Sequence, residues 1–206
     1  MVVVVGGYPL LSGVTLDIGG PSLTVLTGGN GAGKTSLLRL LGGLESLTSG
    51  RAEVMGINLE TGDRRQLRRR VGWLGHEGSF YDELTVRDNL FFAARSLGRP
   101  VDEILPALER VGIGEKSSTV TGRLSAGQRR RFGLAWLLVR RPSLWLLDEP
   151  YASLDSQGRM FLDHLLGDVV AAGAAVIMSS HDPLGAEAPP NVHVNMSGGR
   201  IVGVTN

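Results

Sequence analysis

The segment GGNGAGKT, residues 28–35, combines glycines with a lysine and a hydroxyl side chain in the pattern G-x-x-x-x-G-K-[ST]. It lies between an apolar, β-branched stretch and a stretch with helical spacing, which is the context in which this pattern binds phosphate. Glycines let backbone N–H groups turn inward around a β-phosphate. We expect Lys34 to bridge the β- and γ-phosphates of a nucleotide and the Thr35 hydroxyl to ligate Mg²⁺. The predicted nucleotide-binding residues are Gly28, Gly29, Asn30, Gly31, Ala32, Gly33, Lys34, Thr35 and Ser36.

In LWLLDEP, residues 144–150, an apolar run ends in two carboxylates. A strand that ends there would bring Asp148 to a Mg²⁺ ion beside the phosphate loop. Glu149 follows directly and could orient and deprotonate an attacking water. Two carboxylates at a strand end can also form a solvated helix cap. Together with the phosphate loop, however, they favour phosphoryl transfer to water.

A second candidate phosphate site lies in TGRLSAGQRRRFGLAWLL, residues 121–138. Small, flexible residues come directly before a basic stretch with amphipathic helical spacing. Such an arrangement presents N–H groups at a helix N-terminus, where anions bind. The spacing alone leaves open whose phosphate this site would hold. Its residues, which we call the LSAGQ segment, are Leu124, Ser125, Ala126, Gly127 and Gln128.

Apolar runs between these motifs predict the elements that must position them. We expect strands at 2–5, 14–18, 22–27, 71–75, 143–147 and 174–178, and a terminal hairpin from 192–196 and 200–204. Helical spacing follows Lys34 as far as Gly42, occurs twice between 84 and 112, and returns at 156–172. Pro106 would stand near a helix start or at a kink. The β–α–β alternation predicts a parallel sheet within one domain, residues 1–206.

Composition excludes several classes of function. The 206 residues include 21 basic and 20 acidic ones, so the formal net charge is +1 and no global field favours nucleic acid. The arginine clusters at 64–70 and 129–131 are therefore interpreted as solvated helix faces. The absence of cysteine excludes disulfides and thiolate metal sites. The longest apolar runs have about eight residues, against about twenty for a spanning helix, so we expect a soluble chain.

The phosphate loop, LSAGQ, LWLLDEP, ASLD (residues 152–155) and His181, in this order, resemble the ATP-binding subunit of ABC transporters. The resemblance covers essentially the whole chain. It implies an α/β fold, that of a P-loop NTPase of the ABC ATPase type. Such a fold has a mainly parallel core sheet, an N-terminal antiparallel β part and an inserted helical lobe, here at about 77–140. A P-loop kinase would leave LSAGQ, ASLD and His181 unexplained.

The resemblance also implies what the second phosphate site does. In that family two ATP-binding domains dimerise head to tail, and the LSAGQ segment of each faces the γ-phosphate bound by the other. ATP would then hold together a homodimer whose sites are each half-built in one chain. Asp155 would lie at that interface, and His181 would contact the γ-phosphate as a catalytic residue beside Glu149 and Lys34.

Two positions depart from the family pattern. The family usually stacks an aromatic residue on adenine; Tyr8 is the only candidate, lies about three residues too close to the loop, and could instead pack in its turn. His76 stands where the family carries a glutamine that reaches Mg²⁺ and the attacking water. A neutral imidazole nitrogen could still accept that contact, whereas an imidazolium could not.

With LGHEGSFYDELTVRDNL (residues 74–90), the chain resembles the ATP-binding subunits of the haem exporters in bacterial cytochrome c maturation. This resemblance implies export of haem and a peripheral position on the cytoplasmic side of the inner membrane, held through integral membrane subunits. Two alternatives remain open: an exporter ATPase with another cargo, and a soluble ABC ATPase without transport. Tandem ATPase domains or long insertions are usual for the second alternative, and this chain has neither.

Four aromatic residues within thirteen positions point to a docking surface for membrane subunits. In the family, the helical lobe receives such subunits. Phe80 and Tyr81 are the better candidates for docking. We expect at least one of Phe91 and Phe92 to fill the small core of the lobe instead.

Overall fold

The computed structural model describes residues 1–75, 80–181 and 189–205. Its central element is a six-stranded sheet in the order β10-β9-β3-β8-β7-β6. Neighbouring strands are parallel throughout, except that β9 and β10 are antiparallel. The mainly parallel sheet and the terminal hairpin are confirmed. The strands are β3 (Leu23–Thr27), β6 (Val71–Leu74), β7 (Leu144–Leu147), β8 (Ala175–Ser179), β9 (Val192–Ser197) and β10 (Arg200–Thr205).

The central strands are apolar on both faces because each face packs against its own hydrophobic cluster. In β7, Trp145 and Leu147 belong to one cluster, whereas Leu144 and Leu146 belong to the other. Successive side chains of a strand point to opposite faces of the sheet. A strand buried on both sides therefore shows a continuous apolar run rather than an alternating one.

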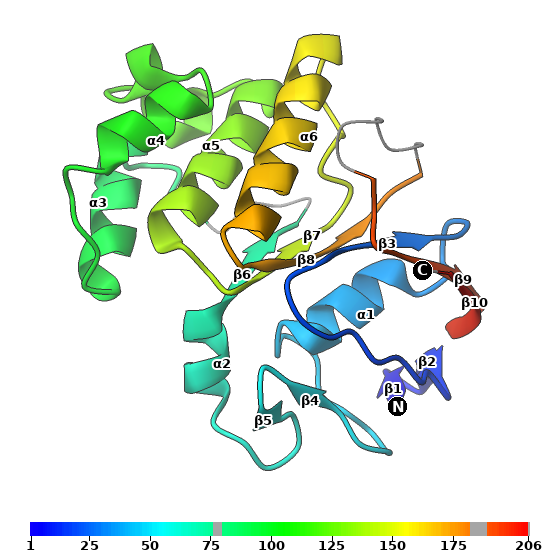
Figure 1. Cartoon of the computed structure of the whole chain (residues 1–206). Helices are drawn as coiled ribbons and strands as arrows, with labels where there is room; N and C mark the ends of the chain where they lie inside the picture. The colour runs from blue at the N-terminus through cyan, green and yellow to red at the C-terminus, as the bar shows by residue number, and fades with distance from the viewer. Residues whose placement is uncertain (76–79, 182–188, 206) are drawn as a thin grey trace.

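Helices cover both faces of this sheet (Figure 1). One cluster includes residues from four helices: α3 (Val86–Ser96), α4 (Ile104–Arg110), α5 (Ala126–Arg140) and α6 (Ser156–Ala171). The opposite cluster includes residues of α1 (Lys34–Leu41) and α2 (Arg64–Arg70). Short 3₁₀ helices at Gly114–Lys116 and Thr121–Arg123 lead from α4 to α5. The limits of the single domain and of the helical lobe stay predictions.

Two small antiparallel sheets lie on the α1 side (Figure 1). One pairs β1 (Val2–Val5) with β2 (Tyr8–Ser12), and the other pairs β4 (Glu53–Val54) with β5 (Ile57–Asn58). The expected N-terminal antiparallel part is thus confirmed. The strand expected at 14–18 is wrong: side-chain burial alternates at its start, but residues 14–18 form no strand. Alternation reports which side chains face the core, whereas a strand also needs a hydrogen-bonded partner.

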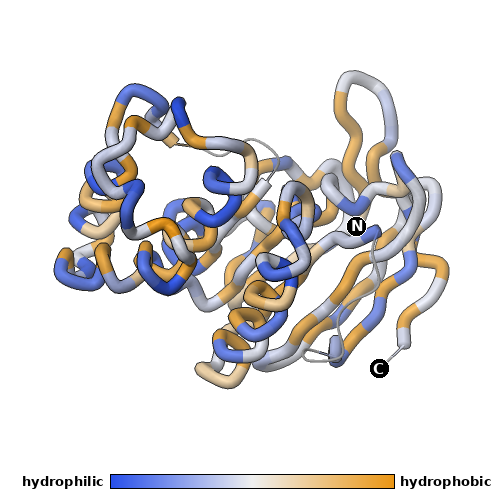
Figure 2. Tube along the Cα trace, turned by 90° about the horizontal axis from the view of Figure 1, so that it is seen from above, coloured by the Kyte–Doolittle hydropathy of each residue, from blue (hydrophilic) through white to orange (hydrophobic). Residues whose placement is uncertain are grey.

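Local sequence explains the ends of the helices. Ser125 and Gln128 form a capping box at the start of α5, with each side chain bonded to the backbone N–H of the other residue. Pro106 is in the first turn of α4, where its missing N–H has no intrahelical partner to lose. Figure 2 shows hydrophobic residues along the strands and alternation of hydrophobic and hydrophilic residues along the outer helices. Among the described residues, no helix has the length and apolarity to cross a bilayer.

Candidate active site

The glycine-rich loop connects β3 to α1 and needs glycine for steric reasons. Gly28 has a φ of 138°, and a Cβ there would lie 2.1 Å from the carbonyl oxygen of Met196 in β9. Gly33 has a φ of 101° at the start of α1. No L-residue side chain fits the first position, and few residues other than glycine adopt such backbone angles. The loop can therefore curl tightly with its N–H groups turned inward.

Lys34 is the first residue of α1 and is only 6% exposed. Its Nζ donates hydrogen bonds to the carbonyl oxygens of Gly28 at 2.7 Å and Gly29 at 3.2 Å. These bonds hold the ammonium group at the loop, beside a cavity of about 590 Å³. The residues that line this cavity are Pro9, Leu10, Asn30, Gly31, Ala32, Gly33, Lys34, Thr35, Ser36, Asp148, Glu149, His181, Gly198 and Gly199.

Thr35 and Asp148 meet at the edge of this cavity. Oγ1 of Thr35 donates to the two carboxylate oxygens of Asp148, at distances of 2.9 and 3.1 Å. Asp148 follows β7 and is 5% exposed. A hydroxyl and a buried carboxylate on adjoining elements form the kind of hard oxygen donor set that Mg²⁺ prefers. These two residues therefore fit a Mg²⁺ ion held together with nucleotide phosphates.

Glu149 has a left-handed backbone, with a φ of 47°. A residue other than glycine in this conformation costs about 1–3 kcal/mol and is enriched at functional sites. Its backbone N–H donates to Oγ of Ser179 at 2.8 Å, which supports the turn. Its Oε1 is buried, and Nε2 of His181 lies 3.1 Å from it. Since Glu149 lines the cavity, its carboxylate can accept a proton or a hydrogen bond there.

His181 lies two residues after the end of β8, between a cation and an anion. Its Nε2 is 3.2 Å from Nζ of Lys34 and 3.1 Å from Oε1 of Glu149. A ring nitrogen that carries hydrogen would donate to the glutamate, and one with a free lone pair would accept from the lysine. It cannot do both at once. His181 therefore contacts both of the other predicted catalytic residues, Lys34 and Glu149.

The structure does not bring the LSAGQ segment to this cavity. Its five residues are exposed or half-buried, and none of them lines the cavity. Glycine is favoured at position 127 for a steric reason, because a Cβ there would lie 3.0 Å from the carbonyl oxygen of Ser153. The segment is thus packed against the ASLD turn and remains accessible from outside.

Asp155 and Tyr8 do not line the cavity either, nor do Gly28 and Gly29 at the start of the loop. Asp155 is the N-cap of α6, where its carboxylate accepts from the N–H of Gly158 at 2.8 Å. Tyr8 begins β2 and is 76% exposed, while the neighbouring Pro9 and Leu10 line the cavity. His76, predicted to be catalytic and to bind Mg²⁺, lies outside the described residues.

Sequence reasoning missed Ser179 and Arg130. Oγ of Ser179 donates to Asp148 at 2.6 Å while it accepts from Glu149, so it joins the two carboxylate residues. The sequence signal that could have identified Ser179 is its position at the end of an apolar strand that pairs with the strand of LWLLDEP. Arg130, in α5, is 8% exposed. Burial lowers the pKa of its guanidinium, whereas the charges of Asp148 and Glu149 act in the opposite direction.

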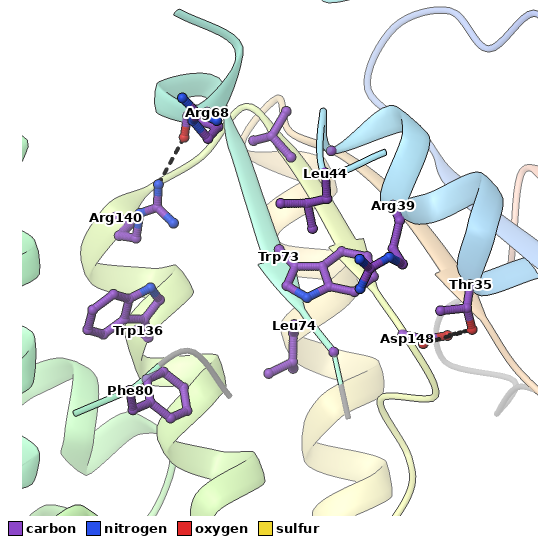
Figure 3. Close-up of a pocket in the computed structure, with 13 residues that line it drawn as sticks. Thr35, Arg39, Leu44, Arg68, Trp73, Leu74, Phe80, Trp136, Arg140 and Asp148 are labelled. Atoms are coloured by element: carbon purple, nitrogen blue, oxygen red, sulfur yellow. Dashed lines mark hydrogen bonds between the residues drawn. The ribbon is translucent and has the colours of Figure 1, made fainter. Parts of the chain in front are cut away.

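A second cavity, of about 670 Å³, lies next to the first (Figure 3). Thr35 and Asp148 lie at one end of it, and Phe80 and Trp136 lie at the other. Phe80 is half-buried against Trp136 and Phe132 of α5, with ring centroids 5.4 and 4.4 Å away. The second cavity therefore connects the candidate Mg²⁺ ligands with an aromatic surface on α5.

The expectation that Phe91 or Phe92 fills the core of the lobe is wrong. Both lie in α3, and they are 43% and 53% exposed. Each makes an exposed contact: Phe92 packs edge-on against Tyr81, and the guanidinium of Arg95 lies over Phe91. The inner face of α3 is occupied instead by Val86, Leu90, Ala93 and Ala94. Helical spacing turns adjacent residues by about 100°, and at 91–92 both side chains point outward.

The chain matches the family model described as ABC transporter over residues 11–152. It is 38% identical over 183 residues to the cytochrome c biogenesis ATP-binding export protein CcmA of Rhodopseudomonas palustris, covering 89% of this chain and 90% of that protein. The solved ATP-binding subunit of an ABC transporter has a TM-score of 0.90 at 24% identity, covering 100% of this chain and 87% of that one. A dimeric ATP-binding cassette with bound ADP and phosphate has a TM-score of 0.84 at 22% identity, covering 96% and 90%.

Proposed function

This chain belongs to the ABC transporter family as an ATP-hydrolysing subunit, and we propose that it drives the haem exporter of bacterial cytochrome c maturation. The cargo is inferred from relatives named for cytochrome c biogenesis, which match the chain over most of its length. The observation that carries the ATPase mechanism is the contact between Lys34, Glu149 and His181 at the mouth of the glycine-rich loop.

The loop and Lys34 bind the phosphates of ATP. Thr35 and Asp148 hold Mg²⁺, which when bound polarises the phosphate oxygens. The carboxylate of Glu149 accepts a proton from a water molecule, whose oxygen bonds to the γ-phosphorus as the bond to the β–γ bridging oxygen breaks. Lys34 and His181 lie where negative charge develops on the transferred group, so they stabilise it and ADP and phosphate are released.

The LSAGQ segment serves the ATP of a second copy of the chain. Its exposure, and its absence from the cavity of its own chain, support this arrangement. Ser125 and Gly127 stand at the start of α5, where the helix dipole attracts anions. Asp155 contributes at the same interface. The dimeric cassette of the related structure supports a pair of this kind. We keep His76 as the residue that reaches Mg²⁺ and water, and Tyr8 as a base contact, on sequence grounds alone.

Integral membrane subunits dock over the second cavity and the exposed aromatic residues beside it. That surface joins Phe80 and Trp136 to the Thr35–Asp148 pair (Figure 3), so a docked helix can sense the nucleotide site. Docking would keep the chain peripheral, on the cytoplasmic side of the inner membrane. ATP binding closes the pair and hydrolysis reopens it, since the closed state has the higher affinity for ATP.

The test uses Glu149→Gln, which is expected to bind ATP, to dimerise in it and to lose turnover. The tagged variant is extracted from native membranes in Mg·ATP, and the proteins that purify with it are identified by mass spectrometry. We expect multi-span proteins together with haem-handling proteins. Multi-span proteins of another kind would reject haem as the cargo. Recovery of ribosomes, repair factors or the chain alone would reject the transporter. Unchanged hydrolysis would remove Glu149 from its role.

A further inference from the structure

Helix α5 binds the chain on both sides of the segment that leads from β6 towards α3. Before the segment, Nη1 of Arg130 donates to the carbonyl oxygen of Gly75 at 3.2 Å. After it, Phe80 packs on Phe132, and Arg129 forms a 2.6 Å ion pair with Asp82. The helix that begins at the LSAGQ segment therefore also fixes both ends of this connection.

Arg130 differs from its neighbours in burial and surroundings. The side chains of Arg129 and Arg131 are 30% and 23% exposed and form ion pairs with Asp82 and Asp155. Arg130 is 8% exposed and lies in the field of Asp148 and Glu149. Arginine stays charged in such a setting, so the helix brings a positive charge close to the catalytic carboxylates.

The backbone connects Arg130 to Asp148 through two consecutive carbonyl groups, those of Gly75 and Leu74. The carbonyl oxygen of Gly75 accepts from Arg130, and the carbonyl oxygen of the preceding Leu74 accepts from the N–H of Asp148 at 2.7 Å. The end of β6 is thus held between α5 on one side and the candidate Mg²⁺ ligand on the other. A displacement of α5 would be transmitted to Asp148 and Glu149 over this short path.

Stability alone is a poor reason for a buried arginine. Removing a guanidinium from water is costly, and this cost largely offsets the attraction between a buried arginine and nearby carboxylates. An apolar residue at 130 would suit the hydrophobic cluster formed by Phe132, Leu134 and Ala135 of the same helix. The arginine therefore calls for an explanation in function.

We propose that Arg130 is a positioning residue for ATP hydrolysis, which fixes the end of β6 against the LSAGQ helix and so aligns Asp148 and Glu149. The proposal rests on the proposed function, because it assigns a role within the same site. Arg130 does not line the cavity at the glycine-rich loop. It acts by holding α5, whose LSAGQ segment serves the ATP of the partner chain, in a fixed position relative to Asp148 and Glu149, which serve the ATP of the same chain.

The test measures kcat and KM for ATP, ATP affinity and the unfolding midpoint of Arg130→Met. Because misplacing reacting groups by about 1 Å can cost about 100-fold in rate, we expect kcat to fall by about 10- to 100-fold. ATP affinity should change by less than about threefold, because the glycine-rich loop is untouched. The midpoint should fall, because Asp148 and Glu149 lose a compensating charge, so kcat is compared well below the midpoint of each variant. Arg130→Lys, which keeps a charge and a donor for Gly75, should recover most of the lost rate.

Arg110→Met is the control. Arg110 forms an ion pair with Asp168 and lines neither the cavity at the glycine-rich loop nor the second cavity. A kcat of Arg130→Met equal to wild type would overturn the proposal, as would an Arg130→Lys variant that recovers none of the lost rate. If the methionine variant does not fold, Arg130→Gln replaces it under the same criteria. Wild type and Glu149→Gln are assayed in parallel. Equal turnover by those two would reject the proposed function instead, independently of Arg130.

Discussion

The hydroxyl of Ser179 donates a hydrogen bond of 2.6 Å to Oδ1 of Asp148. Oγ of Ser179 in turn accepts a hydrogen bond from the backbone N–H of Glu149 at 2.8 Å. One side chain at the end of β8 therefore orients two consecutive residues at the end of β7. Partners that orient metal ligands and catalytic groups in this way contribute strongly to activity although they touch no substrate.

Ser179→Ala should lower ATP turnover by about 10- to 100-fold, because it frees the Asp148 carboxylate and leaves a backbone N–H without its acceptor. The Mg²⁺ concentration for half-maximal activity should rise as well. Both are measured by titrating Mg²⁺ in a steady-state ATPase assay. Ser96→Ala, at the exposed end of α3, is the control. A normal Mg²⁺ dependence in Ser179→Ala would contradict the role of Ser179.

Tyr151 and Asp163 form a buried polar pair just after the catalytic carboxylates. The hydroxyl of Tyr151 donates to the carboxylate of Asp163, and both residues are about 5% exposed. Burial, and then the bond to Asp163, raise the pKa of Tyr151, so the phenol remains a donor. Tyr151→Phe should lower the free energy of unfolding by about 1–3 kcal/mol, because a buried acceptor loses its partner.

The double variant Tyr151→Phe/Asp163→Leu tests this explanation. It should be more stable than the sum of the two single variants predicts, by at least about 1 kcal/mol, because neither half of the pair is then left alone. Denaturant unfolding of the four proteins gives the coupling energy. Simple additivity would mean that the two side chains do not interact in solution.

Gly199, in the turn between β9 and β10, supports the glycine-rich loop. Its N–H donates to the carbonyl oxygen of Ala32 at 3.0 Å, and its carbonyl oxygen accepts from Ser12 at 2.8 Å. A Cβ at Gly199 would lie 2.7 Å from the carbonyl oxygen of Leu10, whereas one at Gly198 would meet nothing within 4 Å. Both glycines have positive φ, 74° and 54°.

This difference provides a matched pair of variants. Gly198→Ala should cost about 1–2 kcal/mol of stability from backbone conformation alone. Gly199→Ala should cost about 1–3 kcal/mol more, because the backbone around Leu10 must shift. It should also weaken ATP binding, through displacement of the loop at Ala32. Denaturant unfolding and a fluorescent ATP analogue measure the two effects, and equal behaviour of the two variants would refute the contact.

Phe92→Ser should reduce the recovery of membrane subunits in the Glu149→Gln extraction experiment. The side chain is 53% exposed, and among the described residues its one ring contact is an edge-on contact with Tyr81. The free energy of unfolding should therefore change by less than about 1 kcal/mol. Met160→Ser, at 54% exposure on α6, is a control of equal exposure. Unchanged recovery with Phe92→Ser would place the docking surface elsewhere.

Much of this architecture follows from the sequence. The glycines of residues 28–33 and the carboxylates of LWLLDEP belong to short, contiguous motifs whose geometry is local. Buried strands such as β3 and β7 were identifiable because both faces demand apolar residues. The prediction of a strand at 14–18 was wrong because the hydrogen-bond partners of a strand depend on tertiary structure. The alternation of apolar and polar residues does not reveal them.

The contacts that the sequence does not reveal join segments far apart in the chain. The bonds of Ser179 to Asp148 and of Arg130 to Gly75 depend on strand order and on the placement of α5. Serine and arginine are common in other settings, so neither residue identity nor spacing distinguishes them. The outward orientation of Phe91 and Phe92 likewise depends on which side of α3 meets the core.

The bond between Gly199 and Ala32 has a consequence for biosynthesis. The glycine-rich loop at residues 28–35 is made early, but the turn that supports it belongs to the much later β9–β10 hairpin. Since chains are synthesised from the N-terminus and domains fold as units, a nascent chain cannot complete its nucleotide site until that hairpin has left the ribosome. Competence to bind ATP is therefore acquired only after β9 and β10 have been synthesised.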